Sequence, residues 1–138
     1  MIIKEDKMEM TIVEAAACGN LKKVKEFIAL GADVNSRARH NSTSLLQASQ
    51  YGHLDVVKYL LDQGADIEAR DERDRTALMR STTFCCLDIL KYLIKQGADV
   101  NAKDDRGWTV LDFTYEYSWP EIRQYLIDNK AVLGTRNK

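Results

Sequence analysis

The chain has 138 residues, of which 30% are charged and 45% are hydrophobic, and its formal net charge is −1. This length fits one domain with a continuous core, and the balanced charge argues against bulk attraction to nucleic acid or membrane surfaces. An odd count of three cysteines, no run of 18 apolar residues and no apolar leader at the N-terminus favour a soluble, reduced, cytoplasmic protein.

A tetrapeptide recurs along the chain with a constant step. Gly-Ala-Asp followed by Val or Ile begins at Gly31, Gly64 and Gly97, 33 residues apart, and a degraded fourth copy begins at Lys130. A fixed period of this length indicates one small unit copied in tandem. We therefore expect a single domain over residues 1–138, with repeats at about 5–37, 38–70, 71–103 and 104–136.

Each repeat predicts two short helices. A threonine at Thr43, Thr76 or Thr109 supplies an N-cap for the first helix, which it stabilises by roughly 1 kcal/mol. A break at Gly19 or Gly52 precedes the second helix, and the glycine of the tetrapeptide ends it where positive φ is needed. Helices of this length do not persist alone, so packing between neighbouring repeats has to stabilise them.

The second repeat carries a recognisable motif. Residues 43–48, 51–61 and 64–67 read TSLLQA, YGHLDVVKYLL and GADI, and this pattern resembles the ankyrin repeat. The resemblance covers four units, although the Pro and His of the family's Thr-Pro-Leu-His signature are absent. It implies an all-α solenoid of stacked helix-turn-helix hairpins with β-turn fingers. It also implies that the finger tips and the first helices form a concave face that binds partners.

The first and last repeats differ from the inner ones in their second helices. Lys23 and Glu26 stand where later repeats have Val56 and Tyr59 or their equivalents, and Arg123 stands in the column of Val57. The two seams are thus expected to face opposite neighbours, with polar ends capping a complete four-repeat array. Tyr115, in a column of small residues, is expected to form an aromatic lid on the C-terminal end together with Trp119 and Tyr125.

The inter-helix turn of the third repeat departs from the pattern. Cys85 occupies the glycine position, as Ser118 does in the fourth repeat. If positive φ is kept there, Cys85 is strained by roughly 1 kcal/mol or more, and this turn is the expected soft spot of the array. The adjacent pair Cys85-Cys86 is expected to fill space, with redox chemistry as the alternative.

Three columns of residues do not look like packing. Basic residues recur in the turns at Arg37, Arg70 and Lys103, and again at Lys7, His40, Arg73 and Arg106. An aromatic row, Tyr51, Phe84 and Tyr117, precedes the inter-helix break. Rigid rings beside arginines make a good recognition surface. The predicted partner-binding residues are Arg39, His40, Tyr51, Arg73, Arg75, Arg80, Phe84, Arg106, Trp108 and Tyr117, and Arg80, Asp112 and Glu116 could form the rim of the patch.

Both features also have plain structural explanations. The Arg37, Arg70 and Lys103 column could only offset the many turn carboxylates, in surface pairs that contribute about 0–1 kcal/mol each. The aromatic row could pack side to side along a groove with no partner. His53 is expected to be structural.

Residues for catalysis or metal binding are not evident in the sequence. No His/Cys cluster has zinc spacing, and there is neither a phosphate-binding glycine loop nor a Ser-His-Asp candidate. We therefore expect no enzyme activity, no cofactor and no metal.

The expected function is protein binding through the concave face. The partner would be a protein with an acidic rim around an apolar centre, and the chain could act as a stand-alone inhibitor or immunity-type protein. The alternative is single-stranded nucleic-acid binding through basic finger tips and stacking rings. An engineered scaffold is disfavoured because the repeats are irregular.

Overall fold

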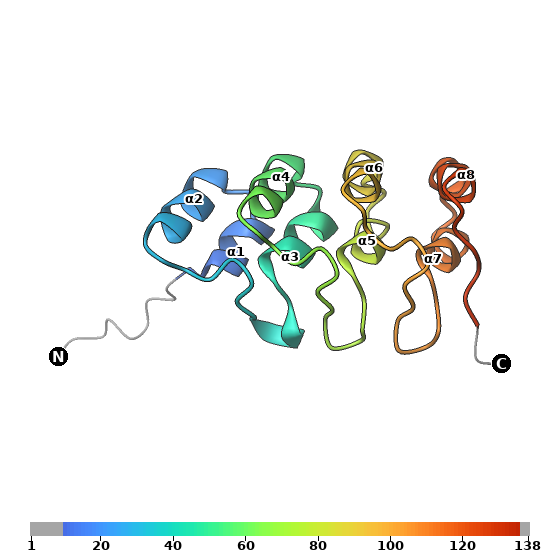
Figure 1. The fold of residues 1–138 in the computed structure, drawn as a ribbon, viewed down its shortest axis with the longest axis horizontal. Coiled ribbons are helices and arrows are strands. Elements are labelled where there is room, and N and C mark those ends of the chain that lie inside the picture. Colours follow the sequence, from blue (N-terminus) through green and yellow to red (C-terminus); the bar gives the residue numbers. More distant parts are fainter. Residues whose placement is uncertain (1–9, 136–138) are drawn as a thin grey trace.

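A computed structural model describes residues 10–135 and shows paired helices along that range. Figure 1 shows α2, α4, α6 and α8 in one row, with α1, α3, α5 and α7 in a second row between them and the turns. No strand occurs in the described range, so the predicted all-α solenoid of helical hairpins is confirmed. The helices are α1 (Ile12–Ala17), α2 (Leu21–Ala29), η2 (Arg39–Asn41), α3 (Ser44–Tyr51), α4 (Leu54–Asp62), α5 (Ala77–Arg80), α6 (Leu87–Lys95), α7 (Val110–Glu116) and α8 (Pro120–Asp128).

Two sequence predictions lie outside residues 10–135. They are the place of Lys7 in the basic turn column and the outer limits of the array, near residues 5 and 136. Within the described range, no helix is both long and apolar enough to cross a bilayer.

Threonine begins the first helix of each hairpin. The hydroxyl oxygens of Thr11, Thr43 and Thr76 accept hydrogen bonds from the backbone N–H three residues later, at 3.2, 3.3 and 3.4 Å. Thr109 holds the same N-cap position, where its own N–H donates to Asp112 Oδ2 at 2.8 Å. The predicted caps are therefore confirmed.

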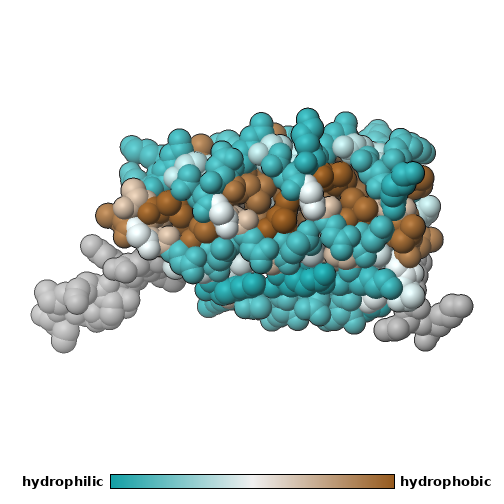
Figure 2. All heavy atoms as spheres, in the orientation of Figure 1, coloured by the Kyte–Doolittle hydropathy of each residue, from teal (hydrophilic) through white to brown (hydrophobic). Residues whose placement is uncertain are grey.

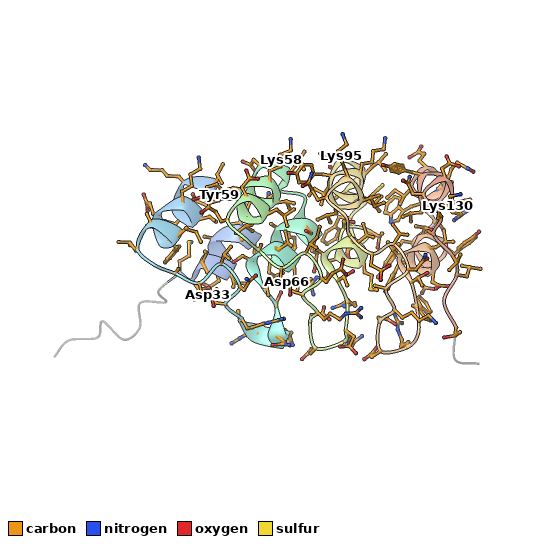
Figure 3. The ribbon with its side chains drawn as sticks, in the orientation of Figure 1. Asp33, Lys58, Tyr59, Asp66, Lys95 and Lys130 are labelled. Atoms are coloured by element: carbon orange, nitrogen blue, oxygen red, sulfur yellow. The ribbon has the colours of Figure 1, made fainter. Side chains whose placement is uncertain are left out.

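The recurring tetrapeptide ends the second helix and starts the next turn. Gly31, Gly64 and Gly97 have φ of 96°, 92° and 97°, a region that residues with a Cβ rarely adopt. The aspartate two residues later then accepts a backbone N–H: Asp33 from Asn35 at 2.9 Å and Asp66 from Glu68 at 3.0 Å. Figure 3 labels both aspartates after their helices. This pair of roles explains why Gly-Ala-Asp repeats.

Small buried side chains let the first helices pack closely. Ala15, Ala48, Ser81 and Thr114 are fully buried, as are Ala16, Ser49 and Thr82 in the next column. Tyr115, the fourth member of that column, is 46% exposed, and the Arg123 guanidinium lies 4.0 Å from its ring centroid. The column therefore changes from small to large in the repeat after which residues 10–135 contain no further hairpin.

The second helices present two different seams to their neighbours. The ammonium groups of Lys25, Lys58 and Lys91 lie 5.5, 5.4 and 5.1 Å from the ring centroids of tyrosines in the following repeat. The seam of Tyr59, Tyr92 and Tyr125 thus faces the preceding repeat. In the first repeat the same column holds Lys23 and Glu26, which form an exposed ion pair at 3.3 Å. These contacts agree with the prediction for the tyrosine seam, whereas the direction of the Val24, Val57 and Leu90 seam stays a prediction.

One residue at the start of each later second helix reaches back to the repeat before it. His53 Nε2 lies 2.9 Å from the Ala17 carbonyl, and Trp119 Nε1 donates to the Thr82 carbonyl at 2.7 Å. The structural role predicted for His53 is confirmed. The predicted aromatic lid is wrong for Trp119 and Tyr125, because both face the third repeat.

Figure 2 shows how polarity is distributed over one face. An apolar band runs along the molecule between the outer helix row and the turns, and the finger region beneath it is hydrophilic. The fingers are therefore the polar edge of the array.

Candidate functional site

The fingers of the third and fourth repeats are held by buried aspartates. Asp71 Oδ1 accepts the N–H groups of Arg73 and Arg75 at 2.9 and 3.0 Å. Asp104 Oδ1 makes the same two bonds one repeat later, with Arg106 and Trp108, both at 2.9 Å. Each carboxylate therefore fixes the tip on which the predicted binding residues stand. In the second repeat Ala38 takes this position, and the tip there is the short η2 turn.

Adjacent fingers are joined through their backbones. The N–H of Glu72 donates to the His40 carbonyl, and the N–H of Asp105 donates to the Arg73 carbonyl, both at 3.0 Å. Side chains of different repeats are thereby held at a fixed separation along the finger edge.

Asp71 is also the centre of a buried ion-pair cluster. Its Oδ2 accepts Arg75 Nε at 2.9 Å and Arg80 Nη1 at 2.7 Å. Burial opposes ionisation of this carboxyl, but the N–H donors of Arg75 and Arg73 and the charges of Arg75 and Arg80 outweigh it. The pKa of Asp71 is therefore below its ordinary value, and the carboxylate is ionised at neutral pH.

Asp112, one of the predicted rim residues, is fully buried, and Arg80 does not lie at an exposed rim either. It is only 6% exposed, and its Nη2 donates to Gln47 Oε1 at 3.0 Å and Ser42 Oγ at 3.4 Å. Its Nε has no hydrogen-bond partner in the described structure. The prediction of a rim position is wrong because Asp71 and Gln47 draw the guanidinium inward, beneath the surface.

A hollow lies above this cluster, between the second and third fingers. It has a volume of about 350 Å³ and contains six of the ten predicted partner-binding residues. These six are Arg39, His40, Tyr51, Arg73, Arg75 and Arg80. Its remaining lining residues are Ser42, Gln47, Gln50 and Glu72.

The hollow carries an excess of positive charge. His40 Nδ1 lies 2.8 Å from Glu72 Oε1, and Asp71 is shared by Arg75 and Arg80. The guanidinium groups of Arg39 and Arg73 make no hydrogen bond or ion pair with residues 10–135. Four arginines thus face two carboxylates here, and two of the arginines have charges that no acidic group offsets directly.

The aromatic row is divided into two clusters. Tyr51 and Phe84 stack with ring centroids 5.8 Å apart and are 48% and 59% exposed. Tyr117, which is 41% exposed, stacks instead on Phe113 of its own helix, at 6.3 Å. The three rings therefore do not form the single row expected from the sequence. Tyr51 and Phe84 form an exposed pair beside the hollow, and Tyr117 lies apart in the last repeat.

The second cluster joins three of the remaining predicted residues. The Arg106 guanidinium lies 4.0 Å from the Trp108 ring centroid and also contacts Asp104 Oδ2 at 3.1 Å. Trp108 packs edge-on against Phe113 at 5.5 Å. The charge of Arg106 is thus partly satisfied within its own finger, unlike that of Arg73.

The column of Arg37 and Arg70 has a structural role that neither sequence explanation anticipated. Arg37 Nη1 donates to the carbonyls of Asn41 and Arg70, at 2.8 and 2.6 Å. Arg70 Nη1 donates likewise to Asp74 and Lys103, at 3.0 and 2.5 Å. Each guanidinium therefore links its own finger to the equivalent residue of the next repeat, and no carboxylate is involved in these bonds.

The cysteines of the third repeat are packing residues. Cys86 is buried, Cys85 is half-buried with φ of 59°, and burial raises the pKa of both thiols. Protonated thiols are poor nucleophiles and poor metal ligands. Positive φ is kept at Cys85, which meets the condition for the strain considered from the sequence, and Ser118 has the same φ of 59°.

Sequence reasoning missed Gln47, Gln50 and Glu72 as lining residues of the hollow. The signal for Gln47 was its column, which holds Glu14, Gln47, Arg80 and Phe113 and has no common chemistry from repeat to repeat. A column without common chemistry makes different contacts in each repeat, and here it places Gln47 against Arg80, while Arg80 and Phe113 are buried.

The comparison with family models agrees with this architecture. A model described as "Ankyrin repeats (3 copies)" matches residues 12–104, which span the first three hairpins and the hollow. A search of curated proteins found no match. Among residues 10–135, no group of three or more His, Cys, Asp and Glu side chains could hold a metal ion.

Proposed function

Because the chain belongs to the ankyrin-repeat family, whose repeats are generally protein–protein interaction modules, we propose that it binds one partner protein on its finger side. The observation that carries this proposal is the exposed Tyr51–Phe84 pair lying directly beside the basic hollow. Stacked rings supply rigid apolar area, and arginines supply forked donors, the two residue types enriched in binding hot spots.

The partner would match this surface with an apolar centre and an acidic rim. Complementary charge of this kind raises the association rate and selects the partner. The binding would be non-catalytic and need no cofactor, in keeping with a family that is typically non-catalytic. A chain of this size, working in the cytoplasm, would act as an inhibitor or immunity-type protein by covering a functional surface of its target.

The test is affinity capture from the native host with substituted chains. The Tyr51→Ala/Phe84→Ala variant is expected to lose the partner captured by the wild type, because it removes the exposed stack. Tyr115→Ala is the matched control, since Tyr115 is an equally exposed ring at the end of the array, away from the fingers. Circular dichroism should show that all variants remain helical.

The same experiment decides between the two aromatic clusters. Tyr117→Ala is expected to retain most of the captured partner, because Tyr117 stacks within the last repeat. If capture survives in Tyr51→Ala/Phe84→Ala and is lost in Tyr117→Ala, the second cluster is the binding site and the present assignment is wrong.

Nucleic-acid binding is the second candidate, because arginines and exposed rings also occur together on single-strand binding surfaces. It predicts that a single-stranded oligonucleotide binds at low salt and is released as salt rises. No binding at low salt would remove this candidate, whereas tight, salt-sensitive binding that depends on Tyr51 and Phe84 would replace the protein-binding proposal.

A further inference from the structure

We propose that the hollow between the second and third fingers receives one carboxylate side chain of the partner, an Asp or Glu next to an apolar residue. This inference rests on the proposed protein-binding function and specifies which chemical group the hollow selects. The apolar neighbour would lie on the Tyr51–Phe84 rings, since Tyr51 belongs both to the stack and to the lining of the hollow.

The first argument is the uncompensated charge. Arg39 and Arg73 are exposed at the mouth of the hollow and have no acidic partner within residues 10–135. Arg75 is half-buried, and only its Nε donates to Asp71. The other two nitrogens of its guanidinium make no hydrogen bond within the described chain. A guanidinium binds a carboxylate through two parallel hydrogen bonds, and such charge-assisted bonds are among the strongest available to a protein.

The second argument is preorganisation. Arg80 forms the floor of the hollow, where Asp71, Gln47 and Ser42 hold its guanidinium in one position. Asp71 also fixes the backbone of Arg73 and Arg75, so these two cations stand on one hydrogen-bonded turn, and the same carboxylate pairs with Arg80 of α5. Groups that are already ordered lose little conformational entropy when a ligand arrives, which favours binding.

The third argument concerns the kind of anion. Four arginines against two carboxylates leave an excess of positive charge that attracts an anion but does not by itself distinguish a carboxylate from a phosphate, so the rest of the lining has to decide. The side-chain amides of Gln47 and Gln50 line the same hollow and can donate to and accept from a peptide backbone. The adjoining rings favour a ligand that combines a carboxylate with an apolar side chain.

The test uses a pair of small probes that differ in one charge. N-acetyl-aspartyl-phenylalanine amide is titrated into the ¹⁵N-labelled full chain, and the asparaginyl analogue serves as the neutral match. The aspartyl probe is expected to shift the amide signals of Arg73, Arg75 and Tyr51, and the analogue to bind about tenfold more weakly, in keeping with the loss of a charge-assisted pair. Equal binding of the two probes, or no binding of the aspartyl probe, would overturn the inference.

Two matched charge variants test whether the aspartyl probe binds in the hollow. Arg39→Gln/Arg73→Gln removes two exposed charges that make no bonds within the described chain, and it is expected to weaken aspartyl-probe binding about tenfold. Lys22→Gln/Lys95→Gln removes the same charge from exposed lysines of α2 and α6 and is expected to change binding less than about twofold, since distant surface charges are screened. Figure 3 shows Lys95 at the outer helix row, away from the fingers. Equal weakening in both variants would show attraction to net charge only and would contradict a specific pocket.

A phosphate titration completes the test. Inorganic phosphate that binds more tightly than the aspartyl probe at equal ionic strength would reassign the hollow to a phosphoryl group and overturn the carboxylate proposal. Failure of the proposed protein-binding function is distinguishable from failure of the carboxylate inference. It would appear as partner capture that persists in Tyr51→Ala/Phe84→Ala, independently of how the two probes bind.

Discussion

At the scale of single residues, Asp71 and Asp104 show how one position serves two purposes. Both aspartates bond the backbone of their own finger in the same way. Asp71 additionally neutralises Arg80, which is buried, whereas the charged partner of Asp104 is Arg106 on the surface. Asp71 alone of the two therefore both holds its turn and pairs with the arginine that forms the floor of the hollow.

Replacing Asp71 is expected to be far more costly than replacing its counterpart. Asp71→Asn leaves the buried Arg80 without a counter-charge and should lower the free energy of unfolding by about 3–5 kcal/mol. Asp104→Asn strands no buried charge and should cost about 1–2 kcal/mol in weakened turn bonds. Urea denaturation of both variants measures this difference, and similar losses would mean that the Arg80 pair contributes nothing beyond the turn.

The Asp71–Arg80 ion pair predicts that the free energy of unfolding depends on pH. Because the pKa of folded Asp71 lies below the ordinary 3.8, its stabilisation is complete above about pH 4 and is lost as the pH falls through the folded value. The stability difference between wild type and Asp71→Asn should therefore narrow below pH 4 and stay constant from pH 5 to 7. A difference that grew on acidification would contradict the direction of this shift.

Residue chemistry was only partly predictable from the sequence. The finger position of Arg73 and the exposure of Tyr51 and Phe84 follow from the repeat alignment, because columns report location. The burial of Arg80 and the backbone bonds of Arg37 do not follow, since they depend on a partner 9 residues away in one case and 33 in the other. The sequence alone does not indicate whether an arginine side chain faces water or a backbone carbonyl.

At the scale of elements, α5 is the shortest α-helix in the described range, with four residues where α3 has eight. The hydroxyls of Ser81 and Thr82 donate to the carbonyls of Leu78 and Met79, both at 2.6 Å. Such local bonds compete with helical ones, and Cys85 then enters the left-handed region. The sequence predicted the strain at Cys85 from the missing glycine, but it gave no sign that the helix would end at Arg80.

This turn is expected to be the least protected segment of the inner repeats. Amide exchange over residues 81–86 should be faster than over the equivalent residues 48–53, and Cys85→Gly should slow it and raise stability by about 0.5–1 kcal/mol, as strain relief exceeds the added chain entropy. Gly52→Ala, at the same position of the second repeat with φ of 83°, should have the opposite sign. The prediction fails if Cys85→Gly is destabilising.

At the scale of the whole molecule, every repeat is tied to the next by the same kinds of link. Asn35 accepts the Asp66 N–H at 2.8 Å, Glu68 accepts the Asp99 N–H at 2.8 Å, and Asn101 accepts the Val132 N–H at 2.9 Å. The period of 33 residues predicted the stacking itself, because it aligned the apolar columns. These links escaped prediction because a polar Asn or Glu in a turn carries no packing signal in the sequence.

Such continuity predicts that the array unfolds as one unit. Val24, fully buried in the first repeat, is distant along the chain from both tryptophans, Trp108 and Trp119, which lie in the fourth. Val24→Ala should cost about 2 kcal/mol and shift the urea midpoint equally by tryptophan fluorescence and by circular dichroism. Leu30→Ala, an exposed change in the same repeat, should shift neither. A fluorescence midpoint unmoved by Val24→Ala would show that the ends unfold independently.

The hollow has one wall on the second finger and the other on the third, so its width depends on the spacing between these two neighbouring hairpins. Flexing the array lengthwise must open or narrow it. A ligand that contacts both walls would oppose this change in spacing. The array would therefore be less flexible along its length when its partner is bound than when it is free.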